Sequence, residues 1–123
     1  MATSELTIET FEETAASNNV VLVDFWAAWC GPCRSFAPVY EKVSEQYPDL
    51  VFAKVDTEAQ QALASTFQIM SIPTLMIIRE KVVIYSQAGA LSEKALVDLV
   101  EQALALDMEA LHLQAAEQAS ADA

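Results

Sequence analysis

Two cysteines, Cys30 and Cys33, are the residues of this chain best suited to chemistry, and they are its only cysteines. They stand in the run Trp29-Cys30-Gly31-Pro32-Cys33, and the residues after them have helical spacing. Cys30 is therefore expected at or near a helix N-terminus, where free N–H groups and the helix dipole favour an anion. A thiolate there has a lowered pKa and is nucleophilic near neutral pH. Each cysteine is the natural redox partner of the other.

Zinc binding is the alternative chemistry for such a pair. Zinc sites usually take four ligands, and the only other soft candidate, His112, lies far along the chain. Two cysteines are also too few for the disulfide framework of a small secreted domain. We therefore expect redox-active cysteines, no metal site and no bound cofactor.

Composition narrows the class of protein further. The 123 residues, of which 54% are apolar, suit one domain with one core. Six basic and eighteen acidic residues give a net charge of −12, the wrong sign for binding nucleic acid. No apolar run is long enough to span a membrane, and the segment Met1–Glu5 lacks the features of a secretory signal. These observations favour a cytoplasmic protein with an acidic surface, and we expect it to be a monomer.

The elements needed to position the cysteines follow from hydrophobic periodicity. The apolar run Val20–Val23 is typical of a central strand buried on both faces. Thr10 and Glu13 fit a capping box, Glu80-Lys81 fits a tight hairpin, and Ser92 fits a helix cap. The predicted order is strand 6–8, helix 11–17, strand 20–23, helix 32–47, strand 50–55, helix 59–67, strand 75–79, strand 82–86 and a helix after Ser92.

This order predicts an α/β fold in which four helices flank a central mixed five-stranded sheet. Residues 1–106 form the predicted domain. Residues 107–123 form an acidic, alanine-rich extension, which either continues as a helix, frays into disorder or packs against a partner.

Asp24 directly follows the central apolar run. A carboxylate is costly to bury there and tends to have a raised pKa. It is either a solvent-facing strand end or a buried proton acceptor for the cysteine pair. Its place just upstream of Cys30 favours the second interpretation.

The motif, the element order and the loop proline together resemble the thioredoxin family, over about Leu6 to Ala105. The motif is supported by residues at the family's relative positions, namely Asp24, Pro38, Lys54, Pro73 and Gly89. The resemblance implies a thioredoxin fold. It implies that Cys30 is the exposed attacking thiol, Cys33 the more buried resolving thiol and Asp24 the carboxylate that exchanges protons with Cys33. It places Lys54 beside Asp24 and makes Pro73 a cis-proline facing the disulfide.

The resemblance also implies a flat apolar surface for substrate proteins, formed by Trp29, Gly31, Pro32, Ile72, Ala88 and Gly89. The implied function is general protein disulfide reduction, with electrons from NADPH delivered indirectly by a thioredoxin reductase. A disulfide oxidant or isomerase, and a binding module whose thiols are secondary, are the alternatives.

Three features depart from the family pattern. The hairpin carries Glu80-Lys81 where Asn-Gly is usual, and neither residue favours positive φ. Met70-Ser71 make the loop before Ile72 apolar and polar rather than basic or glycine-containing. The acidic extension has no counterpart in short family members. None of the three alters the expected chemistry.

Overall fold

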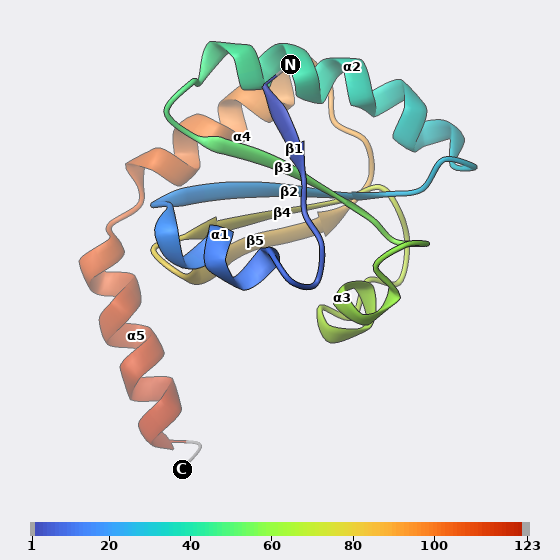
Figure 1. Ribbon diagram of the computed structural model, residues 1–123. Helices are drawn as coiled ribbons and strands as arrows, with labels where there is room; N and C mark the ends of the chain where they lie inside the picture. The colour runs from blue at the N-terminus through green and yellow to red at the C-terminus, as the bar shows by residue number, and fades with distance from the viewer. Residues whose placement is uncertain (1, 122–123) are drawn as a thin grey trace.

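Five strands form one mixed sheet in the computed structural model, which describes residues 2–121. The ends of the predicted domain and extension, residue 1 and residues 122–123, lie outside the described residues. The strands are β1 (Thr3–Glu5), β2 (Val20–Trp26), β3 (Val51–Asp56), β4 (Thr74–Arg79) and β5 (Val82–Ala88). Their spatial order is β1-β3-β2-β4-β5 (Figure 1). β1, β3 and β2 run parallel, whereas β4 is antiparallel to β2 and β5 to β4. The mixed five-stranded sheet is confirmed.

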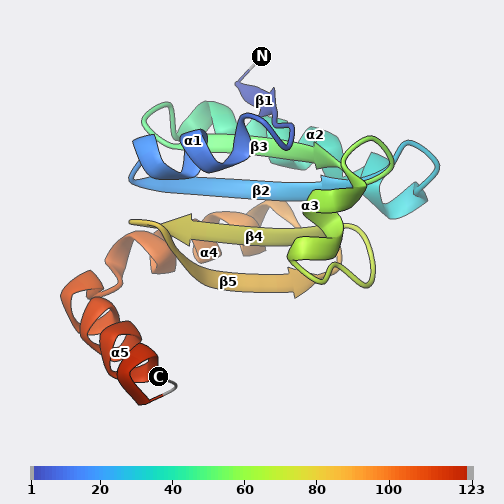
Figure 2. The ribbon, with the colours of Figure 1, turned by 60° about the horizontal axis from the view of Figure 1, so that its bottom comes forward.

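Residues 2–121 contain five helices: α1 (Phe11–Ser17), α2 (Gly31–Gln46), α3 (Gln61–Thr66), α4 (Glu93–Ala105) and α5 (Met108–Ala121). The first four flank the sheet as predicted, and the fifth shows that residues 108–121 of the extension are helical. α2 and α4 cover one face of the sheet, and α1 and α3 cover the other (Figures 1 and 2). α2 continues through Pro38 as a single helix.

The central strand β2 is buried on both faces, as its continuous apolar run predicts. Val20 and Leu22 face the core beneath α2 and α4, whereas Val21, Val23 and Phe25 face the core beneath α1 and α3. Side chains alternate between the faces of a strand, so the next even-numbered position, Asp24, also points toward the α2 side. The strand thereby brings a carboxylate beneath the helix that begins at the cysteines.

Two predictions about the N-terminal segment are wrong. The first strand lies at Thr3–Glu5 rather than at 6–8, because these polar residues pair in parallel with β3 as a short edge strand. The capping box is also absent: the Thr10 side chain makes no cap hydrogen bond to its own helix, and its Oγ1 instead accepts from the N–H of Thr7 at 2.9 Å. The Glu13 carboxylate accepts from Ser17 Oγ at 2.6 Å.

Ser92, in contrast, caps α4 as predicted, because its Oγ accepts from the N–H of Ala95 at 3.1 Å.

The β4–β5 hairpin has a two-residue turn in which both residues adopt the left-handed conformation. Glu80 has φ of 51° and Lys81 has φ of 70°, and the ladder shifts register between Ile77 and Ile78. The turn is held by its surroundings: the N–H of Glu80 donates to Asn19 O at 2.8 Å, and its carboxylate lies 3.1 Å from His112 Nε2.

The extension docks against the end of the domain through its first turns. Arg79 Nη1 lies 2.7 Å from the carbonyl oxygen of Ala103 and 3.1 Å from that of Leu106, so it satisfies carbonyls left open where α4 ends. Met108 is buried, and Asp107 Oδ1 accepts from the N–H of Ala110 to cap α5. Beyond these contacts α5 runs past the hairpin and away from the sheet (Figure 2). Within residues 2–121, no helix is both long and apolar enough to cross a bilayer.

Candidate active site

The cysteine pair lies where β2 gives way to α2. Cys30 is the N-cap of α2, with extended backbone angles, and a disulfide joins it to Cys33 across a Cα–Cα distance of 5.2 Å. The N–H of Cys33 donates to Cys30 Sγ at 3.2 Å. Pro32 occupies the first turn, where a missing N–H costs nothing. In a reduced pair, the same N–H and the positive end of the helix dipole would favour negative charge on Cys30 Sγ.

The two cysteines differ in position rather than in exposed fraction. In the disulfide form Cys30 is 4% exposed and Cys33 is 3% exposed, so the predicted difference in exposure is not seen here. Cys30 nevertheless lines an open hollow of about 470 Å³, and Cys33 does not. The walls of this hollow are mainly apolar and comprise Trp29, Cys30, Gly31, Pro32, Thr57, Ala64, Ile69, Met70, Ser71 and Ile72.

The loop before β4 forms the opposite wall of the hollow. The Ile72–Pro73 peptide bond is cis, and the carbonyl oxygen of Ile72 lies 3.7 Å from Cys30 Sγ. The N–H of Gly89 donates to the carbonyl oxygen of Pro73 at 2.8 Å. Gly89 has φ of 114°, a conformation that residues with a Cβ rarely adopt. This bond holds Ala88 and Gly89 next to the loop, although neither residue lines the hollow beside Cys30.

Asp24 is completely buried on the face of the sheet beneath α2. Neither carboxylate oxygen has a hydrogen-bond partner among the described residues. Burial therefore raises the pKa of Asp24 from 3.8 to about 7, against the opposing effect of Lys54. A carboxyl with this pKa can accept or release a proton at neutral pH.

A short charged row crosses the sheet beneath α2. Asp24, Lys54 and Glu5 stand side by side on β2, β3 and β1. Lys54 lowers the pKa of Asp24, and Glu5 raises it. Lys54 Nζ also lies 4.8 Å from the centre of the Trp26 ring, a cation–π contact. Lys54 therefore lies beside Asp24, where the resemblance places it.

Sequence reasoning missed the residues that brace the walls of the hollow. The exposed Trp29 donates from its indole Nε1 to Glu58 Oε1 at 2.6 Å. Arg34 Nη1 donates to the carbonyl oxygen of Ala28 at 2.8 Å, across the loop before Cys30. Thr74 Oγ1 donates to the carbonyl oxygen of Ser71 at 2.6 Å. These contacts join segments up to 29 residues apart, and no local pattern indicates them.

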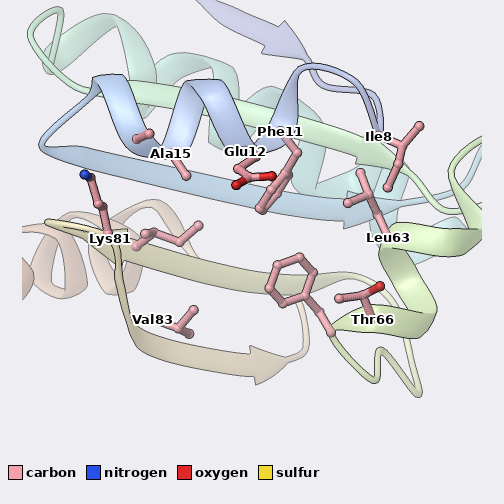
Figure 3. A pocket seen from close by; sticks show the side chains of 11 residues that line it. Ile8, Phe11, Glu12, Ala15, Leu63, Thr66, Lys81 and Val83 are labelled. Carbon is pink, nitrogen blue, oxygen red and sulfur yellow. The ribbon is translucent and has the colours of Figure 1, made fainter. Parts of the chain in front are cut away.

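A second hollow, of about 530 Å³, lies away from the cysteines between α1, α3 and the β4–β5 hairpin. Figure 3 shows the side chains of Phe11, Ala15, Leu63 and Val83 around the same space, with Lys81 at one end. It is larger than the hollow beside Cys30, but none of the predicted site residues lines it. The disulfide lies at the smaller hollow, which Cys30 lines. Residues 2–121 hold no cluster of three or more side chains suited to a metal ion.

A disulfide at a helix N-terminus, beside an open apolar hollow on an α/β sheet, is the arrangement typical of a thiol–disulfide oxidoreductase. The thioredoxin family model matches residues 2–102. The putative thioredoxin 2 of Streptomyces coelicolor is 58% identical over 117 residues, covering 95% of this chain and 87% of the relative. The thioredoxin of Bacillus subtilis is 38% identical over 105 residues, covering 85% and 100%. A solved structure of a mutant thioredoxin from Halobacterium salinarum aligns with a TM-score of 0.79 at 36% identity, covering 85% and 93%.

The chain belongs to the thioredoxin family, and its fold is the thioredoxin fold. It is a thiol–disulfide oxidoreductase of the protein-disulfide reductase kind, and its own redox-active disulfide is the reacting group. The match to the Streptomyces protein leaves out only about a twentieth of the chain, so it reaches into the region of α5, whereas the family model ends at residue 102.

Proposed function

We propose that this chain is a general protein disulfide reductase that carries electrons from a thioredoxin reductase, and ultimately from NADPH, to disulfides of cytoplasmic proteins. One observation carries the proposal: the disulfide lies at the start of α2 with Cys30, but not Cys33, on the wall of an open apolar hollow. A docked disulfide would reach Cys30 first.

The reaction consists of two exchanges. The Cys30 thiolate attacks one sulfur of the substrate disulfide, and the other substrate sulfur leaves as a thiolate. Cys33 loses its proton and attacks Cys30 Sγ, which breaks the mixed disulfide and releases the second substrate thiolate. The substrate gains two electrons and leaves as two thiolates, which then take up protons from solvent, and the Cys30–Cys33 disulfide is formed. The reductase returns two electrons to this disulfide.

Asp24 is the proposed acceptor for the Cys33 proton. Its pKa of about 7 lets it exist in either protonation state under cytoplasmic conditions. Its side chain lies on the sheet face covered by α2, the helix that carries Cys33 in its first turn. Lys54 is a proposed positioning residue, because its charge opposes the effect of burial on Asp24.

Protein substrates are proposed to dock on Trp29, Gly31, Pro32, Ile72, Ala88 and Gly89. Within the described residues, neither the N–H nor the carbonyl oxygen of Ile72 makes a backbone hydrogen bond. An extended substrate segment could pair with both groups as an added strand does. Pro73, which follows Ile72, has no N–H to compete for the same segment.

Two measurements on the full chain test the proposal. The reduction potential of the Cys30–Cys33 pair, equilibrated against a thiol buffer and followed by tryptophan fluorescence, is expected near −270 mV. A value of about −180 to −120 mV would assign the chain to the isomerases or oxidants instead. Insulin, whose disulfides serve as a general protein substrate, should form a stable mixed disulfide with Cys33→Ser. It should form none with Cys30→Ser, and a mixed disulfide at Cys33 would refute the assigned order.

A further inference from the structure

Met70 stands out among the described methionines of this chain. Its residue surface is 93% exposed, whereas Met76 is 2% exposed and Met108 is 6% exposed. It lies two residues before Ile72 and lines the hollow beside Cys30, as Trp29 does. Its thioether is therefore both open to small oxidants and part of the surface on which a protein disulfide would dock.

A thioether is oxidised by hydrogen peroxide in one balanced step. The sulfur gives up two electrons and forms a bond to one peroxide oxygen. The O–O bond breaks, and the second oxygen leaves as water. The product, methionine sulfoxide, is polar where the thioether was apolar, and methionine sulfoxide reductases reverse the change.

We propose that Met70 is an oxidative modification site, and that its conversion to the sulfoxide by hydrogen peroxide weakens docking of protein disulfides while leaving the chemistry of Cys30 and Cys33 unchanged. The inference rests on the proposed function, because it requires that protein substrates cover this hollow.

The physical reason lies in the walls of the hollow. Trp29, Pro32, Ile69 and Ile72 offer a docked segment mainly apolar surface. A sulfoxide oxygen on Met70 would have to leave water for a surface that is mainly apolar, which disfavours the complex. The free-energy cost of taking such a polar group out of water corresponds to a decrease of about tenfold in the rate constant for reduction of a docked substrate. A small polar disulfide that meets Cys30 without covering the hollow is not affected.

The first part of the test measures selectivity. The full chain, with Cys30 and Cys33 held as the disulfide so that peroxide cannot consume thiols, is treated with hydrogen peroxide and mapped by peptide mass spectrometry. Met70 should gain one oxygen at least tenfold faster than Met76 and Met108. Equal rates at the three methionines would overturn the proposal.

The second part measures function after the treated chain has been reduced with dithiothreitol and freed of excess reagent. Oxidation of the reduced protein is followed by tryptophan fluorescence, once with insulin and once with bis(2-hydroxyethyl) disulfide. The rate constant with insulin should fall about tenfold, and that with the small disulfide should stay within twofold. Treatment with a methionine sulfoxide reductase should restore the insulin rate. An unchanged insulin rate at full Met70 oxidation, or an equal loss with both disulfides, would overturn the proposal.

Two variants separate this modification from other peroxide damage. Met70→Leu, whatever its own starting rate, should lose no insulin activity on peroxide treatment, and an equal loss to that of the unaltered chain would refute the role of Met70. Met70→Gln should reproduce the effect without peroxide. Leu113→Gln, a polar change at an exposed apolar residue on α5, is the matched control and should leave the insulin rate unchanged. An untreated chain that fails to reduce insulin would instead refute the proposed function.

Discussion

Replacing Asp24 by asparagine should stabilise the protein, and by an amount that depends on pH. Asparagine has nearly the shape of the protonated carboxyl but cannot ionise. In the unfolded chain Asp24 releases its proton near pH 3.8, whereas in the folded protein its pKa is about 7, because burial penalises the charged form. Between these values the folded state holds a proton that the unfolded state has lost, so stability falls as pH rises.

The magnitude follows from the two pKa values. Each pH unit between them removes about 1.4 kcal/mol from the free energy of unfolding of the unaltered chain. Above pH 7 the Asp24 carboxyl ionises in the folded state as well, so the loss of unfolding free energy levels off at about 4 kcal/mol. The Asp24→Asn variant avoids this loss. Its advantage should be about 1.5 kcal/mol at pH 5 and should approach 4 kcal/mol at pH 8.

Urea unfolding of the oxidised proteins at pH 5, 6, 7 and 8, followed by tryptophan fluorescence, measures the advantage directly. Other titrating groups are common to both proteins and cancel in the difference. Glu9→Gln, at an exposed carboxyl, is the matched control and should change stability by less than about 0.5 kcal/mol at every pH. A difference between the Asp24→Asn variant and the unaltered chain that does not change with pH would show that Asp24 ionises normally, and would remove it from the proposed proton transfer.

Two further changes test neighbouring parts of the structure. Lys54→Met removes the cation that lowers the pKa of Asp24, so this pKa should rise above its present value of about 7 in a carboxyl carbon NMR titration; a fall would mean that Lys54 does not act on Asp24 through its charge. Met108→Ala should lower the free energy of unfolding by about 2 kcal/mol in urea, because the side chain is buried where α5 docks, whereas Leu113→Ala should change it little. Equal effects of the two alanine variants would show that α5 does not pack as described.

The sheet and the cysteine site could be predicted because their signals are local. The apolar run of β2 indicates a strand covered on both faces, and the Trp29–Cys33 motif indicates the redox pair. The start of the chain could not be predicted in the same way. β1 carries no apolar alternation, and its position is set by backbone pairing with β3, which leaves no trace in side-chain type. Periodicity reports burial, and it does not detect an edge strand whose side chains are mostly in solvent.

The hairpin shows a second limit of local reasoning. Glu80 and Lys81 have little intrinsic preference for positive φ, yet both adopt it. The contacts that fix the turn come from Asn19 before β2 and from His112 in α5. The sequence offers His112 only as a distant candidate zinc ligand, since nothing near it in the chain indicates Glu80, 32 residues away, as its partner. Tertiary contacts decide the turn here, and they also anchor the extension that the sequence left as helix, disorder or partner surface.

The two glycines of the chain show how far a residue type alone can carry a functional argument. Both fall in the proposed site, but for different physical reasons. Gly89 has φ of 114°, so its own backbone requires glycine even in the free protein. At Gly31 a Cβ would meet nothing closer than Arg34 Nη2 at 4.0 Å, so the folded chain by itself does not require glycine there. The space above Gly31 is open beside Cys30, and a requirement for glycine at this position would therefore come from the approach of the substrate.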